Sequence, residues 1–170
     1  MQRIMIIGGP GSGKSTLARA LGARLGLPVV HIDPMFWEPG WVQRDTGQTR
    51  EMIAAAAAQE AWIFEGNSSV TYAGRAARAD LIVFLDLPRP LRLWRILKRR
   101  VMFHGRTRPE MPANCPERLD PAFLAEVWSW DRRTRPKAMA VLALRGGQIP
   151  TLRLTSPRQV RRFLADPGNW

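Results

Sequence analysis

A run of nine residues near the N-terminus has the types and spacing that bind phosphate. It fits the pattern G-x-x-x-x-G-K-[ST], in which glycines let backbone N–H groups turn inward around an anion. Lys14 has the reach to contact the β- and γ-phosphates of a nucleoside triphosphate, and the Ser15 hydroxyl suits the coordination shell of Mg²⁺. A plain turn between strand and helix has no use for these two residues. We therefore expect a nucleotide site at Gly8, Gly9, Pro10, Gly11, Ser12, Gly13, Lys14, Ser15 and Thr16.

Three acidic residues follow apolar runs and are candidates for metal or proton chemistry. Asp33 comes directly after the second run, where a carboxylate suits acceptance of a hydroxyl proton or orientation of Mg²⁺ through water. Its alternative role is an Asx turn ahead of Pro34. Glu65 ends the third run and suits the binding of Mg²⁺ through a water molecule. Its alternative role is that of a solvated acid in a loop. Asp86 ends the fourth run, and we expect it to cap the helix that follows.

The segment between Pro88 and Pro109 is basic throughout. Such a run is usually a solvated face. Phosphoryl transfer, however, needs cations on the equatorial oxygens of the transferred group, and an arginine on a mobile segment is a common source. We expect two or three of these residues to touch phosphate, with Arg99 and Arg106 as the catalytic pair and a lid over about residues 104–122. The eight basic residues are Arg89, Arg92, Arg95, Lys98, Arg99, Arg100, Arg106 and Arg108.

Other residue types carry weaker signals. Trp37, Trp41 and Tyr72 suit the stacking of a ring-bearing acceptor, although most aromatic side chains pack inside the protein. His31 is more typical of a core or supporting group than of a catalyst. Cys115 shows no local sign of an activated thiol.

The elements that must position these residues alternate between strands and helices. Helical spacing predicts helices over residues 14–25, 46–59, 88–101, 121–145 and 158–164. Residues 33–47 and 66–79 are typical of loops, the second with a short helical piece. The alternation predicts an α/β fold whose parallel strands end at the ligand site. Apolar runs place these strands at residues 3–7, 28–32, 61–64, 81–87 and 149–154.

Length and composition narrow the class of protein. The chain has 170 residues, 45% of them apolar, which suits a single domain over residues 1–170. We expect a cytoplasmic protein, because no membrane span or secretion signal is visible. One cysteine excludes an internal disulfide and a multi-cysteine zinc site. The net charge is +12, most of it in the second half and nearly all from arginine, which favours a nucleotide or nucleic acid as partner.

The chain resembles the adenylate kinase-related P-loop proteins of bacteria that are called DNA topology modulation proteins or simply kinases. The likeness covers roughly residues 2–156 and implies a three-layer P-loop NTPase fold, with a five-stranded parallel sheet of order 2-3-1-4-5 and an arginine-rich lid. Related sequences usually have aspartate at the position of Glu65, and this turn lacks the Asp-Gly-Phe-Pro-Arg signature of true adenylate kinases. The likeness rests on the P-loop, His31-x-Asp33, Phe64-Glu65-Gly66-Asn67, the basic helix and Gly105-Arg106-Thr107-Arg108-Pro109.

The leading hypothesis is a kinase that transfers the γ-phosphoryl group of ATP to a small-molecule acceptor, either a hydroxyl metabolite or a nucleoside monophosphate. ATP and Mg²⁺ are the expected ligands, and adenine is expected near Arg99 and Ser156. Catalysis is expected from Lys14, Asp33, Arg99 and Arg106, metal binding from Ser15 and Glu65, and acceptor binding from Asp33, Trp41, Asn67 and Arg75.

Three alternatives remain open. A nucleoside monophosphate would need Arg75 or Arg78 on its phosphate. The names of the relatives and the charge suggest a nucleotide-dependent DNA-binding protein, but no helix-turn-helix or comparable reader is visible. A nucleotidase is the third. The sequence permits a monomer or a homodimer.

Overall fold

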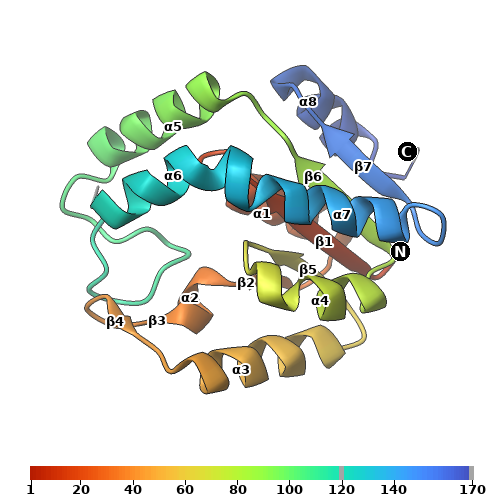
Figure 1. Cartoon of the computed structure of the whole chain (residues 1–170), viewed down its shortest axis with the longest axis horizontal. Helices are drawn as coiled ribbons and strands as arrows, with labels where there is room; N and C mark the ends of the chain where they lie inside the picture. The colour runs from red at the N-terminus through yellow and green to blue at the C-terminus, as the bar shows by residue number, and fades with distance from the viewer. Residues whose placement is uncertain (119–120, 169–170) are drawn as a thin grey trace.

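A parallel five-stranded sheet forms the centre of the protein (Figure 1). The computed structural model describes residues 1–118 and 121–168. The strands lie in the order β2-β5-β1-β6-β7, and every pair is parallel. In chain order this arrangement is 2-3-1-4-5, so the expected topology is confirmed. The strands are β1 (Arg3–Gly8), β2 (Val29–His31), β5 (Trp62–Glu65), β6 (Leu81–Leu85) and β7 (Thr151–Leu154).

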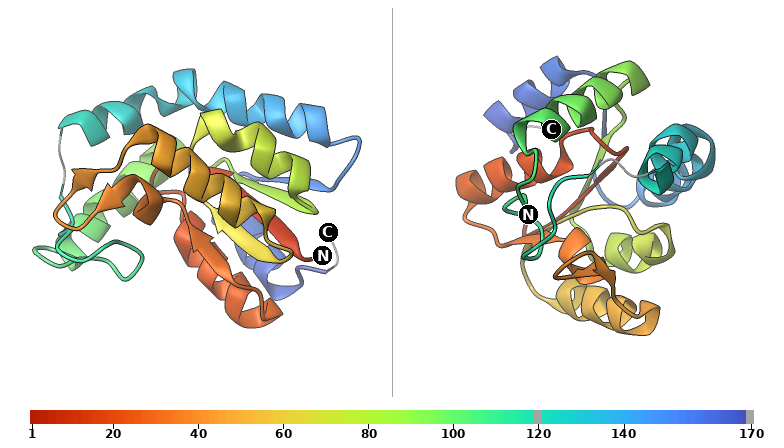
Figure 2. Two further views of the ribbon diagram at one scale, coloured as in Figure 1. Left: turned by 90° about the horizontal axis from the view of Figure 1, so that it is seen from below. Right: turned by 90° about the vertical axis from the view of Figure 1, so that its left-hand side faces the viewer.

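The three central strands are apolar because helices cover both faces of the sheet. Alternate side chains point to opposite faces. Met5 and Ile7 of β1 pack with helices α3 (Thr46–Ala58), α4 (Tyr72–Arg78) and α7 (Arg135–Arg145). Ile4 and Ile6 pack with α1 (Lys14–Leu25) and α8 (Pro157–Ala165). Figure 2 (left) shows α7 and α1 on opposite sides of the sheet, which gives the three layers.

Residues 33–47 differ from the irregular loop that the sequence predicts. They contain a one-turn helix, α2 (Asp33–Phe36), and a short antiparallel hairpin of β3 (Trp37–Glu38) and β4 (Val42–Gln43). The turn places Gly40 and Trp41 at positive φ angles of 80° and 62°. The proline and glycine residues that suggested a loop belong to this helix start and this turn.

The helix expected over residues 121–145 is divided into two. Helix α6 (Pro121–Arg133) ends before Thr134, and α7 begins at Arg135. Pro136 lies in the first turn of α7, where its missing N–H costs nothing, whereas in a continuous helix it would remove a hydrogen bond. The two helices lie end to end along one side of the sheet (Figure 2, left).

The expected lid lies between α5 (Arg89–Met102) and α6. Two of its residues, 119 and 120, lie outside the described parts of the chain. Its chain doubles back on itself through isolated bridges from His104 to Glu117 and from Thr107 to Pro116. It also contacts the β3–β4 hairpin, because the Gly40 N–H donates to the Ala113 carbonyl at 3.3 Å. Within residues 1–118 and 121–168, no helix is long and apolar enough to cross a bilayer.

Candidate active site

The loop between β1 and α1 has the geometry of an anion site. Gly13 precedes the helix with φ of 92° and, as a glycine, has no side chain to cap the first N–H groups of α1. The Ser12 hydroxyl is buried and has no hydrogen-bond partner within the described residues. Open N–H donors and the positive end of the helix dipole both favour an anion here. The loop therefore fits the phosphate groups of a nucleotide.

Helix α5 packs directly against this loop and explains two of its glycines. A Cβ on Gly9 would lie 2.4 Å from Nη1 of Arg92, and one on Gly11 would lie 2.4 Å from the Arg92 carbonyl. The Arg95 guanidinium donates to the Ser12 carbonyl at 3.0 Å. The basic helix thus supports the back of the loop.

Lys14 lies folded over the start of the loop. Its Nζ donates to the carbonyls of Gly8 at 3.1 Å and Gly9 at 3.3 Å. Burial lowers the pKa of the Lys14 ammonium, although the carboxylates of Glu65 and Asp33 oppose this shift. The ammonium is held by two uncharged carbonyl acceptors, which a charged phosphate can replace.

Glu65 lies at the centre of a polar cluster at the end of β5. It is buried, accepts a hydrogen bond from the Ser15 hydroxyl at 3.0 Å and lies 2.7 Å from Nδ1 of His31. Burial raises the pKa of Glu65, but the hydrogen bonds from His31 and Ser15 and the charge of Lys14 outweigh it, so the net pKa is lowered. An ionised carboxylate beside a hydroxyl suits a hard cation such as Mg²⁺.

Asp33 is the first residue of α2 and faces the same cluster. Burial and the charge of Glu65 raise the pKa of Asp33, while Lys14, Arg108 and Arg99 oppose the shift. The carboxylate is half-buried and makes no hydrogen bond within the described residues. Its electrostatic partners come from β5, the start of α1, α5 and the lid.

Helix α5 and the lid each bring one arginine to this side of the protein. Arg99 and Arg108 both form ion pairs with Glu117, and both act on the charge of Asp33. The side chain of Arg106, which we expected to be catalytic, is exposed and pairs with no described residue. The sequence analysis named Arg108 only as part of the basic run and missed Glu117. The sequence gives no spacing signal for this pairing, because the lid is not periodic.

The remaining expected acceptor residues have structural contacts. Asn67 holds Gly8, because its Nδ2 donates to the Gly8 carbonyl at 2.8 Å. Tyr72 is buried and donates its hydroxyl to Asn67, so this ring packs inside the protein and is not open for stacking. Trp41 contacts the lid, where its Nε1 donates to the Pro116 carbonyl at 3.1 Å.

Arg75 is buried rather than open to an acceptor. Its guanidinium lies over the rings of Phe64 and Tyr72 and donates to the Gly66 carbonyl at 3.2 Å. Burial lowers its pKa to about 10. Arg78 donates to the Ala58 carbonyl, at the far end of α3.

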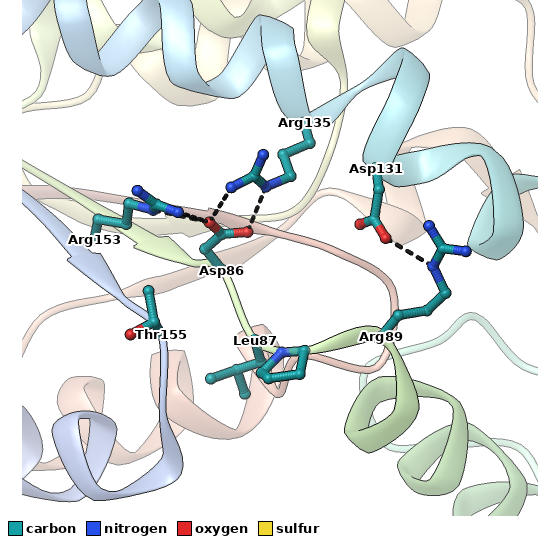
Figure 3. A pocket seen from close by; sticks show the side chains of 8 residues that line it. Asp86, Leu87, Arg89, Asp131, Arg135, Arg153 and Thr155 are labelled. Carbon is teal, nitrogen blue, oxygen red and sulfur yellow. Dashed lines mark hydrogen bonds and ion pairs between the residues drawn. The ribbon is translucent and has the colours of Figure 1, made fainter.

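A cavity of about 420 Å³ lies at the ends of β6 and β7 (Figure 3). Asp86, in its wall, accepts hydrogen bonds from Arg135 and Arg153 at 2.8 Å, so its expected role as a helix cap is wrong. Burial opposes these hydrogen bonds, but they lower the pKa of Asp86. Asp131 joins this wall to the phosphate loop, since it pairs with Arg89 and also with Arg92.

Comparisons with known proteins agree with this geometry. A family model described as an AAA domain matches residues 4–110, so the chain belongs to this family of P-loop domains. Shikimate kinase from Acinetobacter baumannii, solved with shikimate, has a TM-score of 0.63 at 16% identity. The match covers 98% of this chain and 90% of the shikimate kinase chain. Deoxyadenosine kinase from M. mycoides with bound dCTP has a TM-score of 0.51 at 14% identity, and the match covers 99% of this chain and 100% of the deoxyadenosine kinase chain.

These likenesses show the fold, which is that of P-loop small-molecule kinases, and the expected P-loop fold is confirmed. No curated protein matches the chain in sequence.

Proposed function

We propose that this protein is an ATP-dependent kinase with a small-molecule acceptor that carries a hydroxyl group. The observation that carries the proposal is that Lys14, Asp33 and Glu65, from three different elements, are grouped around the phosphate loop. Lys14 and Asp33 act on each other electrostatically, and the Ser15 hydroxyl donates to Glu65. A phosphate site, a metal-binding pair and a carboxylate of raised pKa are the parts that phosphoryl transfer to a hydroxyl requires.

Each residue has a role in the transfer. The phosphate loop and Lys14 bind the β- and γ-phosphates, for which Lys14 leaves the carbonyls of Gly8 and Gly9. Asp33 accepts the acceptor's hydroxyl proton as the acceptor oxygen bonds to the γ-phosphorus and the bridging oxygen leaves with ADP. Arg99 offsets charge on the transferred group, and the exposed Arg106 would have to turn inward on closure to join it.

Mg²⁺ would be held by the Ser15 hydroxyl and, through water, by Glu65, and it would neutralise phosphate charge when bound. His31 keeps the Glu65 carboxylate in place from the other side.

The cavity at Asp86 suits the nucleoside end of ATP. Its volume of about 420 Å³ is in the usual range for small-ligand sites. Leu87 and Pro88 supply apolar surface, Thr155 supplies a hydroxyl, and Arg92 joins this wall to Gly9 of the phosphate loop.

The structure favours a hydroxyl metabolite over a nucleoside monophosphate. The arginines that would hold an acceptor phosphate, Arg75 and Arg78, donate instead to carbonyls of the chain. It also gives little support to DNA binding, because much of the basic segment is engaged internally. Its internally bound residues are Arg89, Arg92, Arg95, Arg99 and Arg108.

The testing experiment measures ATP consumption by the purified protein with Mg²⁺ against a panel of hydroxylated metabolites and nucleoside monophosphates. We expect one hydroxylated metabolite to stimulate turnover, and Lys14→Ala to abolish the stimulation. Tight ATP binding with no stimulation by any acceptor would contradict the proposal. Stimulation by a nucleoside monophosphate alone would keep the kinase and overturn the acceptor class.

A further inference from the structure

Glu117 is a buried carboxylate that divides its two oxygens between two arginines. Its side chain is 3% exposed. Oε1 lies 2.6 Å from Nε of Arg99, at the end of α5, and Oε2 lies 2.7 Å from Nε of Arg108, in the lid. The two arginines therefore meet at one anion although they come from separate segments.

The backbone fixes the position of Glu117. Its N–H donates to the Arg106 carbonyl at 2.9 Å, and its residue forms a bridge with His104. A charge buried this deeply is retained in proteins where opposite charges pair with it. Both arginines are thus held by an acid that the folded lid places between them.

The geometry of the ion pairs leaves one edge of each guanidinium available. Glu117 accepts a hydrogen bond from Nε of Arg99, whereas its contact with Nε of Arg108 is an ion pair without hydrogen-bond geometry. The terminal Nη atoms of both arginines make no hydrogen bond within the described residues. A guanidinium has five N–H donors in a planar fork, so the Nη edge can still bind two oxygens of a phosphoryl group. The charges of both arginines act on Asp33, the proposed base for the acceptor hydroxyl.

We propose that Glu117 is a positioning residue that sets Arg99 and Arg108 as a pair, with their Nη edges toward the phosphoryl group in transfer. The proposal rests on the kinase function proposed above and adds Arg108 to its binding groups. Glu117 acts through the two arginines and touches no substrate.

The test measures the affinity of the protein for ADP with Mg²⁺, with and without aluminium fluoride, which mimics the transferred phosphoryl group. The wild type should bind ADP with aluminium fluoride far more tightly than ADP alone. Glu117→Gln keeps the shape of the side chain but removes its charge. It should reduce the tightening, which is the gain in ADP affinity on adding aluminium fluoride, about 30-fold. It should change the affinity for ADP alone less than threefold.

Three further variants separate positioning from a structural effect. Glu117→Asp keeps the charge and should recover part of the tightening. Arg108→Lys keeps a cation for Glu117 but removes the Nη edge of the guanidinium, so it should reduce the tightening. This variant tests the proposal even if Glu117→Gln fails to fold. Lys98→Gln, next to Arg99 and exposed, is the matched control and should leave the tightening unchanged.

The outcomes distinguish the two proposals. A wild type that shows no tightening contradicts the kinase function. A wild type that tightens while Glu117→Gln and Arg108→Lys tighten equally well overturns the role of Glu117. Equal losses of affinity for ADP alone and for ADP with aluminium fluoride in Glu117→Gln would also overturn it, because they would indicate a general disturbance of the fold.

Discussion

The phosphate loop and the lid arrange charge around the same site by different means. The loop uses its main chain, since glycine geometry and the uncapped start of α1 provide the donors. The lid uses side chains, because Arg99, Arg108 and Glu117 hold one another through ion pairs. A main-chain site keeps its shape as long as the glycines are present, whereas a side-chain site depends on every partner.

This difference has a consequence for motion. The loop is braced by Arg92 and Arg95 of α5 and by Asn67 after β5, so it is rigid on all sides. The lid is held by polar contacts with the hairpin and by the ion pair of its Glu117 with Arg99 of α5. We therefore expect catalysis to be lost by single changes at the loop and to be reduced in steps at the lid.

The largest effect is expected at Lys14. Lys14→Ala should lower acceptor-stimulated turnover about 10³-fold, because it removes the cation nearest the transferred group. Steady-state kinetics with ATP would measure the loss. The exposed Lys137→Ala is the control and should keep full turnover. A loss of less than tenfold in Lys14→Ala would show that the loop does not dominate the site.

Asp33→Asn should separate activity from stability. Turnover should fall about 100-fold, as expected for loss of a general base. Burial and the charge of Glu65 raise the pKa of Asp33, so its ionised form opposes folding above about pH 4, and asparagine should increase the unfolding free energy at pH 7. This gain should vanish below pH 4, where the carboxyl group is protonated in both states. Denaturant unfolding at pH 7 and pH 3 checks the sign, and a loss of stability at pH 7 would contradict it.

Asp86→Asn tests the ion pairs that join the end of β6 to α7 and β7. The change leaves Arg135 and Arg153 without their anion and should lower the unfolding free energy by about 2 kcal/mol. Glu38→Gln breaks the more exposed pair with Arg44 and should cost less than about 1 kcal/mol. Urea unfolding of the two variants compares them, and equal losses would show that burial does not matter here.

The smallest effect is a shift in pH dependence. Burial and the charge of Glu65 raise the pKa of Asp33, so Glu65→Gln should move the acidic limb of kcat/KM to lower pH. The exposed Glu60→Gln should leave the limb in place. A limb that moves to higher pH in Glu65→Gln would mean that another group controls it.

Much of the fold was predictable because local patterns agree with it. The apolar runs of β1 and β6 and the spacing of Leu17 and Leu21 in α1 result from burial against the two layers. The break at Thr134 was missed because both halves continue one apolar pattern, and only Pro136 marks the boundary.

The site was less predictable where side chains define it. The phosphate loop follows from its glycines, but the pairing of Asp86 with Arg135 and Arg153 joins residues from three distant segments. Likewise, nothing in the order of the basic residues distinguishes Arg108, held by Glu117, from the exposed Arg106. Such pairs depend on tertiary distance, which a single sequence does not contain.

The chain has only one thiol, and it lies where the hairpin meets the lid. The Cys115 Sγ is buried, accepts the Trp41 N–H at 3.3 Å and lies 3.5 Å from the Glu38 carbonyl. A thiol reagent can reach this sulfur only when the hairpin and the lid separate. The rate of alkylation of the unmodified protein therefore reports how often the hairpin and the lid separate. Ligands that close the lid will slow this rate.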